Sequence, residues 1–253
     1  MASIIAISNQ KGGVGKTTTT ANLGSALFMM GRRVLLVDMD PQANLTTSFG
    51  LSAEPETSIA DSLLDRKVRL PICSIAENLE ARLDIVPSSL ALASAEAALM
   101  NKLGRELRLR DQLALFSSAY DFIVIDTPPS LGLLTINALV AADKVVIPTE
   151  ARLFSLQGLQ MMQDSIEEIL YLNPRLQVAG ILLSKLDKRL KEEKLVSAYL
   201  RDRWGTQVFE TEVGTNSKIL EAASSGTSVF NYAGAEKAAD GYLALAREVL
   251  SRG

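Results

Sequence analysis

The sequence predicts an α/β fold in which one domain, residues 1–253, forms a doubly wound, mostly parallel sheet with helices on both faces. Three observations lead to this prediction. Short apolar runs rich in Val and Ile alternate with longer helical patterns along the chain. The runs lack polar alternation, which is typical of parallel strands covered on both faces. The length of 253 residues, with 47% hydrophobic residues, suits one large domain with a full core.

The elements follow in order from this pattern. Strands are expected at residues 4–7, 34–37, 83–86, 122–125, 145–147 and 178–183. Helices are expected at residues 17–30, 90–103, 105–118, 131–141, 156–172, 190–204 and 236–250, where apolar residues recur at helical spacing. Gly31 stands where the first helix needs a C-terminal cap. Such alternation predicts right-handed crossovers and a ligand site at the carboxyl ends of the strands.

Composition excludes several classes of function. Lys and Arg total 26 and Asp and Glu total 29, so the formal net charge is −3. Without a global basic field, binding to nucleic acid would need a local patch or an assembly of chains. The chain has no His and one Cys, Cys73. This excludes imidazole catalysis and, within one chain, a disulfide, a cysteine zinc cluster or an iron–sulfur site.

No targeting segment is apparent. No apolar run approaches the roughly 20 residues that a membrane-spanning helix needs, and the N-terminus lacks the basic start of a signal peptide. We therefore expect a cytoplasmic protein with no membrane partner.

The first expected strand leads into a glycine-rich loop and then a helix. The loop reads Gly12, Gly13, Val14, Gly15, Lys16, Thr17, Thr18. Glycines let successive N–H groups turn inward around phosphate oxygens, and the helix N-terminus adds a favourable dipole. Lys16 would supply a charge to the phosphates, and the Thr17 hydroxyl would complete a Mg²⁺ shell. The alternative is a glycine-rich turn without a ligand.

Carboxylates follow two other strands. The strand at 34–37 ends in Asp38 and Asp40, and the strand at 122–125 ends in Asp126. Carboxyl ends of parallel strands meet at one edge of a sheet, so we expect these groups beside the glycine loop, where Mg²⁺ and an attacking water would lie. The alternatives are a capping Asp before a turn at Asp40-Pro41 and an ordinary apolar strand capped by Asp126.

Lys11, directly before the glycines, adds a further signal. The segment 11–18, KGGVGKTT, resembles the deviant Walker A motif of the family that contains ParA and Soj partition ATPases, MinD and the nitrogenase iron protein. Residues 38–44, DMDPQAN, are similar to the switch I segment of the partition ATPases, and residues 126–130, DTPPS, to their switch II. The resemblance spans essentially the whole chain. It implies a P-loop NTPase fold with ATP and Mg²⁺ as cofactors.

The resemblance also implies roles for single residues. Lys11 would reach across an ATP sandwich dimer to the partner's phosphates, like an arginine finger; the alternative is a solvated loop lysine. Asp38 would organise metal and water, Asp40 would be most needed for hydrolysis, and Asp126 would hold Mg²⁺. The loop with Gly214 and Asn216 would contact adenine, although Gly214 stands where relatives usually have a proline.

Among family members, the chain is most similar to short ParA/Soj proteins without an N-terminal DNA-binding extension. The nitrogenase iron protein needs two ligating cysteines in each subunit. MinD ends in a basic amphipathic membrane helix, whereas residues 236–250 mix acidic and basic side chains. We expect that last helix to pack on the sheet.

Proteins of this type bind double-stranded DNA non-specifically, which requires clustered cations. The candidate contacts are Lys185, Lys188, Arg189 and Lys218. Relatives usually carry an arginine at the position of Thr215, and commonly a glutamate near the dimer face at that of Arg152. The alternative is a solvated surface of mixed charge. The two departures suggest a divergent branch.

The leading hypothesis is a nucleoid-associated Mg-ATPase of the ParA type. It would form an ATP-bound homodimer on DNA and would segregate or position a plasmid, a chromosome or another cargo. A ParB-like or cargo-adaptor protein would stimulate hydrolysis. The alternatives are a MinD-like membrane-associated regulator of division-site placement and a metabolic P-loop enzyme that phosphorylates or ligates a small substrate.

Overall fold

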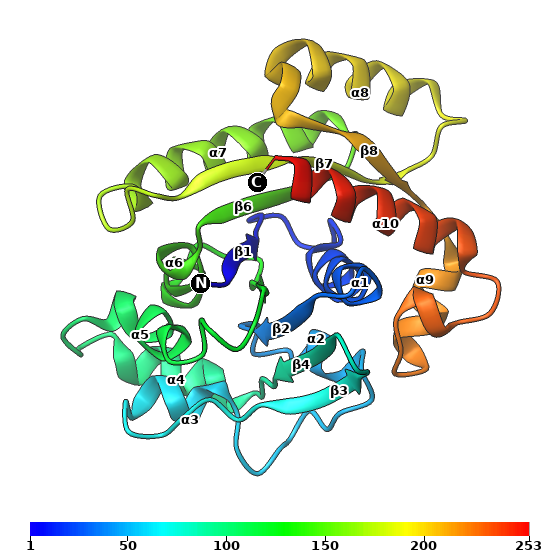
Figure 1. Ribbon diagram of the computed structural model, residues 1–253. Helices are drawn as coiled ribbons and strands as arrows, with labels where there is room; N and C mark the ends of the chain where they lie inside the picture. Colours follow the sequence, from blue (N-terminus) through cyan, green and yellow to red (C-terminus); the bar gives the residue numbers. More distant parts are fainter. Residues whose placement is uncertain (253) are drawn as a thin grey trace.

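The protein forms one eight-stranded sheet in a computed structural model that describes residues 1–252, except for the side chains of Leu153 and Phe154. The strand order is β3-β4-β2-β5-β1-β6-β7-β8, and each neighbouring pair is parallel except β3 with β4 (Figure 1). The strands are β1 (Ser3–Ile7), β2 (Arg33–Asp38), β3 (Cys73–Glu77), β4 (Arg82–Val86), β5 (Phe122–Asp126), β6 (Lys144–Thr149), β7 (Gln177–Leu186) and β8 (Val208–Gly214). The doubly wound, mostly parallel fold expected from the sequence is confirmed.

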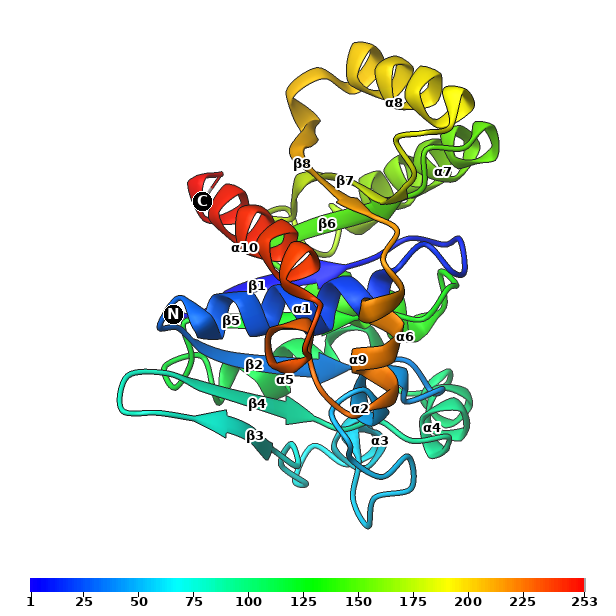
Figure 2. The same ribbon diagram turned by 90° about the vertical axis from the view of Figure 1, so that its right-hand side faces the viewer.

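Helices cover both faces of the sheet (Figures 1 and 2). One face carries α1 (Lys16–Met29), α9 (Ser217–Ser224) and α10 (Glu236–Ser251). The other carries α3 (Ile59–Leu64), α4 (Ala91–Leu99), α5 (Arg108–Ala114), α6 (Leu133–Ala141), α7 (Leu153–Ile169) and α8 (Lys191–Trp204). The short α2 (Asn44–Thr47) follows β2. Among the described residues, no helix combines the length and apolar character needed to cross a bilayer.

The strands are apolar because both of their faces are buried. In β2, Val34 and Leu36 pack toward α1 and α10, whereas Leu35 and Val37 pack toward α3, α4 and α6. Successive side chains of a strand point to opposite faces, so a continuous apolar run serves two cores at once. The expected strands therefore appear within a few residues of their predicted bounds.

The apolar face of α10 lies inside the fold. Ala238, Tyr242, Leu245 and Val249 are buried in the core that α10 shares with α1 and the sheet. The expectation that the last helix packs on the sheet is confirmed.

Several elements differ from expectation. Strands β3 and β8 were not predicted. Each lies at an edge of the sheet, and polar residues interrupt its apolar ones, such as Glu210 and Glu212 in β8. The short helices α2, α3 and α9 were also missed. The expected helix 105–118 is a 3₁₀ turn, Arg105–Leu107, followed by α5, which ends at Ala114. The expected helix 156–172 is α7, which begins and ends three residues earlier than predicted.

Two glycines adopt the left-handed conformation that the turns around α1 require. Gly15, directly before α1, has φ of 87°, and Gly31, two residues after its end, has φ of 79°. At the helix end, Gly31 N–H donates to the Phe28 carbonyl and Arg32 N–H to the Leu27 carbonyl, so the last turn is capped as expected. These turns place the glycine loop and the start of α1 at the carboxyl edge of the sheet.

Candidate functional site

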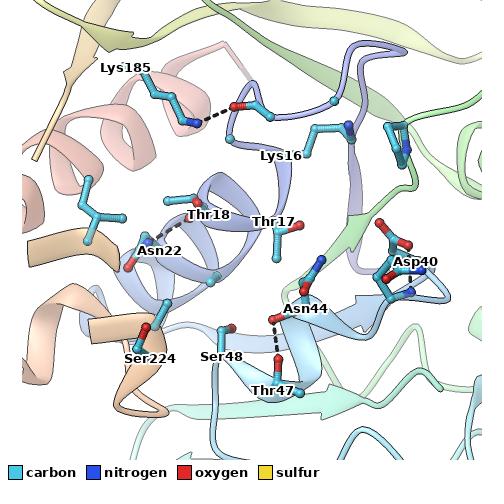
Figure 3. A pocket seen from close by; sticks show the side chains of 18 of the residues that line it. Lys16, Thr17, Thr18, Asn22, Asp40, Asn44, Thr47, Ser48, Lys185 and Ser224 are labelled. Carbon is cyan, nitrogen blue, oxygen red and sulfur yellow. Dashed lines mark hydrogen bonds between the residues drawn. The ribbon is translucent and has the colours of Figure 1, made fainter. Parts of the chain in front are cut away.

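A cleft of about 530 Å³ opens at the carboxyl edge of the sheet, around the N-terminus of α1 (Figure 3). The β1–α1 loop and α1 form one part of its wall. The segments after β2 and β5, the end of β7, and α9 with the residues after it form the rest. The lining residues are Gly12, Gly13, Gly15, Lys16, Thr17, Thr18, Ala21, Asn22, Asp40, Gln42, Asn44, Thr47, Ser48, Pro129, Lys185, Ile219, Ala223, Ser224 and Thr227.

The glycine loop is curled around the start of α1. Gly13 has φ of 79° and Gly15 of 87°, a conformation that side chains with a Cβ rarely adopt. Asn9 holds the entry to the loop, because its side chain donates to the Pro148 carbonyl at 2.8 Å and accepts from Lys11 N–H at 3.0 Å. These two bonds fix the backbone where the chain enters the loop.

Lys16 is 7% exposed and lines the cleft. Its ammonium donates to the Lys11 carbonyl at 3.2 Å. Burial lowers its pKa, and the nearby charges of Asp126 and Asp40 partly oppose that shift. A buried ammonium with few fixed partners gains from an incoming anion, so phosphate is a suitable ligand here.

Asp38 is wholly buried and is not among the lining residues of the cleft. One carboxylate oxygen accepts bonds from the backbone N–H and the hydroxyl of Thr46, at 2.9 and 2.7 Å, and the other accepts from Asp40 N–H at 3.1 Å. Its observed contacts anchor the segment after β2 to α2. Its expected role as a metal ligand stays a prediction.

Asp40 reaches the cleft that Asp38 does not. It is 7% exposed, and one carboxylate oxygen accepts from Gln42 N–H at 2.9 Å. The Ser88 hydroxyl donates to the Asp40 carbonyl at 2.7 Å, which fixes its backbone. The Asp40 carboxylate can thus receive a hydrogen bond from a molecule in the cleft.

Asp126 lies beside Asp38, since the two are register partners on β5 and β2. One oxygen accepts from the Thr20 hydroxyl at 3.3 Å, and the other is buried with no hydrogen-bond partner among the described residues. Burial, followed by the charge of Asp38, raises the pKa of Asp126 to about 8. Burial likewise raises the pKa of Asp38 to about 6. A cation would relieve both effects.

The donor set fits Mg²⁺ rather than a transition metal. Among the described residues, no group of three or more His, Cys, Asp and Glu side chains could hold an ion by itself. Mg²⁺ usually takes one or two protein oxygens and completes its shell with water and phosphate. The unpartnered oxygen of Asp126 and the hydroxyl of Thr17, which lines the cleft, suit that pattern.

Lys11 is outside the lining of the cleft. Its ammonium lies 3.5 Å from a carboxylate oxygen of Glu150, and the Arg152 guanidinium lies 3.4 Å from the same oxygen. Arg152 also approaches Glu193 at 3.9 Å. In the single chain, Lys11 is therefore paired with Glu150.

Gly214 and Asn216 also lie away from the cleft lining. They line a second cavity of about 520 Å³, together with Lys188, Arg189 and Lys237. The Asn216 side chain accepts from Lys218 N–H at 2.9 Å and so caps α9. Their expected contact with adenine is untested by this geometry and stays a prediction.

The four cations expected to contact DNA already have partners. Lys188 pairs with Glu212 at 2.8 Å, Arg189 with Asp187 at 2.8 Å, and Lys218 with Glu221 at 2.7 Å. Lys185 instead donates to a carbonyl of the glycine loop. The chain does not gather these four as a patch of unpaired positive charge.

Sequence reasoning missed part of the cleft wall. The side of the cleft formed by Ile219, Ala223, Ser224 and Thr227 comes from an unpredicted helix and the segment after it. Lys185 was noticed only as a cation. Its position at the carboxyl end of a buried strand was the signal that could have placed it at this edge of the sheet.

Known proteins resemble the chain along its whole length. A family model described as an AAA domain matches residues 2–178. The sporulation initiation inhibitor protein Soj of Bacillus subtilis is 42% identical over 259 residues, and the match covers all of both proteins. The chromosome partitioning protein ParA of Myxococcus xanthus is 43% identical over 252 residues, which cover 98% of this chain and 88% of that protein.

A solved structure has the same fold. The crystal structure of cobyrinic acid a,c-diamide synthase from Mycobacterium smegmatis with bound ATP analog and magnesium has a TM-score of 0.85 and 32% identity, covering 99% of this chain and 95% of that one. Together with the curled glycine loop, Lys16 and the paired strand-end carboxylates, these full-length matches establish that the chain belongs to the ParA/Soj family of P-loop ATPases.

Proposed function

We propose that this chain is a Mg²⁺-dependent ATPase of the ParA type that acts in DNA partition. The observation that carries the proposal is the cleft itself. A curled glycine loop, the buried ammonium of Lys16 and the Asp40 carboxylate all face one space. Such a set binds a triphosphate and presents a carboxylate beside it.

Each residue has a physical task in this proposal. The loop N–H groups and Lys16 would hold the phosphates, and Thr17 with Asp126 would hold Mg²⁺. When bound, Mg²⁺ neutralises phosphate charge and draws negative charge from the bond that breaks. Asp40 would orient the attacking water, because its carboxylate reaches the cleft and is not fully engaged by protein donors. Asp38 would act mainly by holding the Asp40 segment in place.

ATP would support a sandwich dimer through Lys11. Its side chain is 35% exposed, and its one ion pair among the described residues is with Glu150 at 3.5 Å, so the ammonium can leave at a small cost in free energy. In a dimer, it would meet the partner's phosphates and offset charge that would otherwise be buried at the interface. Glu150 would then be released to Arg152.

Lys11→Ala should therefore keep ATP binding by the monomer but lose ATP-dependent dimerisation. The measurement is light scattering with ATP in an Asp40→Ala background, with and without the Lys11 change. If the double variant dimerises as tightly as Asp40→Ala alone, Lys11 has no role in dimerisation and is an ordinary loop residue.

DNA binding and partner stimulation rest on the family. The proposal is that the ATP dimer binds DNA non-specifically and that a ParB-like or cargo-adaptor protein stimulates hydrolysis. DNA would have to displace the acidic partners of Lys188, Arg189 and Lys218. A dimer would present two copies of this surface and so make more contacts with DNA phosphates. Each contact releases counterions and thereby favours the exchange.

The test of the whole proposal is DNA binding with ATP, with ADP and without nucleotide across a series of salt concentrations. Retention only with ATP, weakening steeply with salt, is the expected result. Equal binding in all three nucleotide states would contradict it.

One rival is supported by a specific observation. The 32% identity to cobyrinic acid a,c-diamide synthase favours a metabolic P-loop enzyme as the second candidate. A small substrate that raises ATP turnover, in the absence of DNA and protein partners, would favour this candidate.

A further inference from the structure

Lys185 reaches from the end of β7 to the glycine loop. Its ammonium donates to the Gly13 carbonyl at 2.5 Å, across 172 positions of sequence, and its side chain lines the same cleft as Lys16 (Figure 3). The neighbouring Ser184 hydroxyl donates to the Val14 carbonyl at 2.7 Å and lies 3.1 Å from the Thr149 carbonyl. Two successive residues of β7 thus hold two successive carbonyls of the loop.

The backbone of Lys185 is itself held in an unusual conformation. Its φ is 54°, one of two positive values at non-glycine residues in the described part of the chain. The Thr215 hydroxyl donates to the Lys185 carbonyl at 2.9 Å, and Thr215 N–H donates to the Leu186 carbonyl at 3.3 Å. This left-handed turn, which side chains with a Cβ adopt only when their surroundings impose it, aims the lysine at the loop.

Holding these carbonyls has a consequence for the loop N–H groups. In a planar trans peptide, the carbonyl and the following N–H point in opposite directions. The bonds to the Gly13 and Val14 carbonyls therefore turn the N–H groups of Val14 and Gly15 away from β7. In a phosphate-binding loop, these N–H groups must be oriented before the ligand arrives if the ligand is not to bear the cost of ordering them.

We propose that Lys185 is a positioning residue for nucleotide binding: its bond to the Gly13 carbonyl fixes the glycine loop, and its charge adds to that of Lys16 in the cleft. Thr215 holds the turn that positions this lysine, through its hydrogen bonds to the Lys185 and Leu186 carbonyls. The inference rests on the proposed binding of MgATP in the cleft. It assigns Lys185 to the nucleotide rather than to DNA.

The test is calorimetric titration of MgATP and MgADP into Lys185→Met, a variant of similar length that lacks the ammonium. A lost charge-assisted hydrogen bond at an exposed position predicts affinity about five- to tenfold weaker for both nucleotides. Turnover at saturating ATP should change less than affinity does, because Lys185 would position the loop and not the attacking water. Lys185→Arg, which keeps a donor and a charge, should recover most of the affinity.

Thr215→Val sharpens the test. It should weaken nucleotide binding by a smaller factor in the wild-type background and by no further factor in Lys185→Met, since both changes act through one turn. Lys194→Met is the matched control, because Lys194 is an exposed lysine of α8. Thermal unfolding without nucleotide shows whether each variant is folded; should Lys185→Met unfold, Thr215→Val and Lys185→Arg carry the same test.

The outcomes are distinguishable. Affinity of Lys185→Met within twofold of wild type would overturn the inference, and a simultaneous loss of DNA binding would make Lys185 a DNA contact. Wild-type protein that binds neither nucleotide would overturn the proposed function instead.

Discussion

Two neighbouring regions at the carboxyl edge of the sheet are built differently. The floor, which we define as the glycine loop with Lys16, Asp38, Asp40 and Asp126, carries charged side chains that are at most 7% exposed. The rim, which we define as residues 185–189 and 214–218, carries mostly exposed side chains in surface ion pairs. In the floor, burial lowers the pKa of Lys16, and the nearby charges of Asp126 and Asp40 partly oppose that shift. Lys188 in the rim is 72% exposed and is neutralised by Glu212.

The two regions therefore differ in how strongly their charges interact and in how easily those charges change partners. Charges in the floor have lost their water, so each interaction there is strong and each unpaired group is costly. Ion pairs in the rim exchange easily with solvent and contribute little to folding. We infer that the floor performs chemistry that any family member could share, whereas the rim can change its partners from one protein to another.

Lys16→Ala should have the largest effect. It removes the only buried ammonium of the floor and disturbs the loop through the lost bond to the Lys11 carbonyl. We expect MgATP affinity to fall by about 100-fold or more, measured by calorimetry. Unchanged affinity would remove the basis for placing phosphate in the cleft.

Asp40→Ala should separate binding from hydrolysis. Loss of a carboxylate that orients water should reduce turnover by about 100-fold, while the loop N–H groups and Lys16 still bind ATP. The variant should therefore hold its dimer, and DNA, longer than wild type does. Phosphate release and gel filtration with ATP measure the two effects. Normal turnover would transfer the role to Asp38 or Asp126.

Asp126 should make the stability of the nucleotide-free protein depend on pH. Its pKa is raised to about 8 in the folded chain, from an ordinary value of 3.8. The folded state then holds a proton more tightly than the unfolded state, so the stabilisation is complete below about pH 4 and is lost as pH rises through 8. Asp38, with a pKa raised to about 6, acts in the same direction.

The expected result is a free energy of unfolding in urea that falls between pH 5.5 and 8.5, with a shallower fall in Asp126→Asn. Saturating MgADP should also flatten the dependence in wild type. Asp202→Asn, at an exposed carboxylate of α8, serves as the control. A slope that is equal in Asp126→Asn and wild type would mean that Asp126 ionises normally.

Lys188→Met should have the smallest effect on folding and so tests the rim. Breaking its pair with Glu212 should shift the melting temperature by no more than about 2 °C. If the rim contacts DNA in the ATP state, the slope of log affinity against log salt should fall by about one unit. A large loss of stability with an unchanged salt slope would show that the rim is structural, and the comparison with the floor would fail.

The floor could be predicted because its determinants are local. Gly13 and Gly15 have the positive φ values that the loop requires, and Asp38 and Asp126 end neighbouring strands as their apolar runs indicated. The differing exposure of Asp38 and Asp40 was not predictable. Both were expected beside the glycine loop, but the chain leaves β2 after Asp38, and Thr46 then covers that carboxylate.

Local sequence was enough to predict the inner strands of the sheet and the curled loop, because backbone geometry and apolar periodicity act over a few residues. The tertiary structure alone decided which charges meet. It paired Lys11 with Glu150, brought Lys185 to the Gly13 carbonyl, and placed Gly214 and Asn216 beside a second cavity. These contacts join residues far apart in the chain, and their partners depend on strand order and on loop paths that the unpredicted β8 and α9 complete.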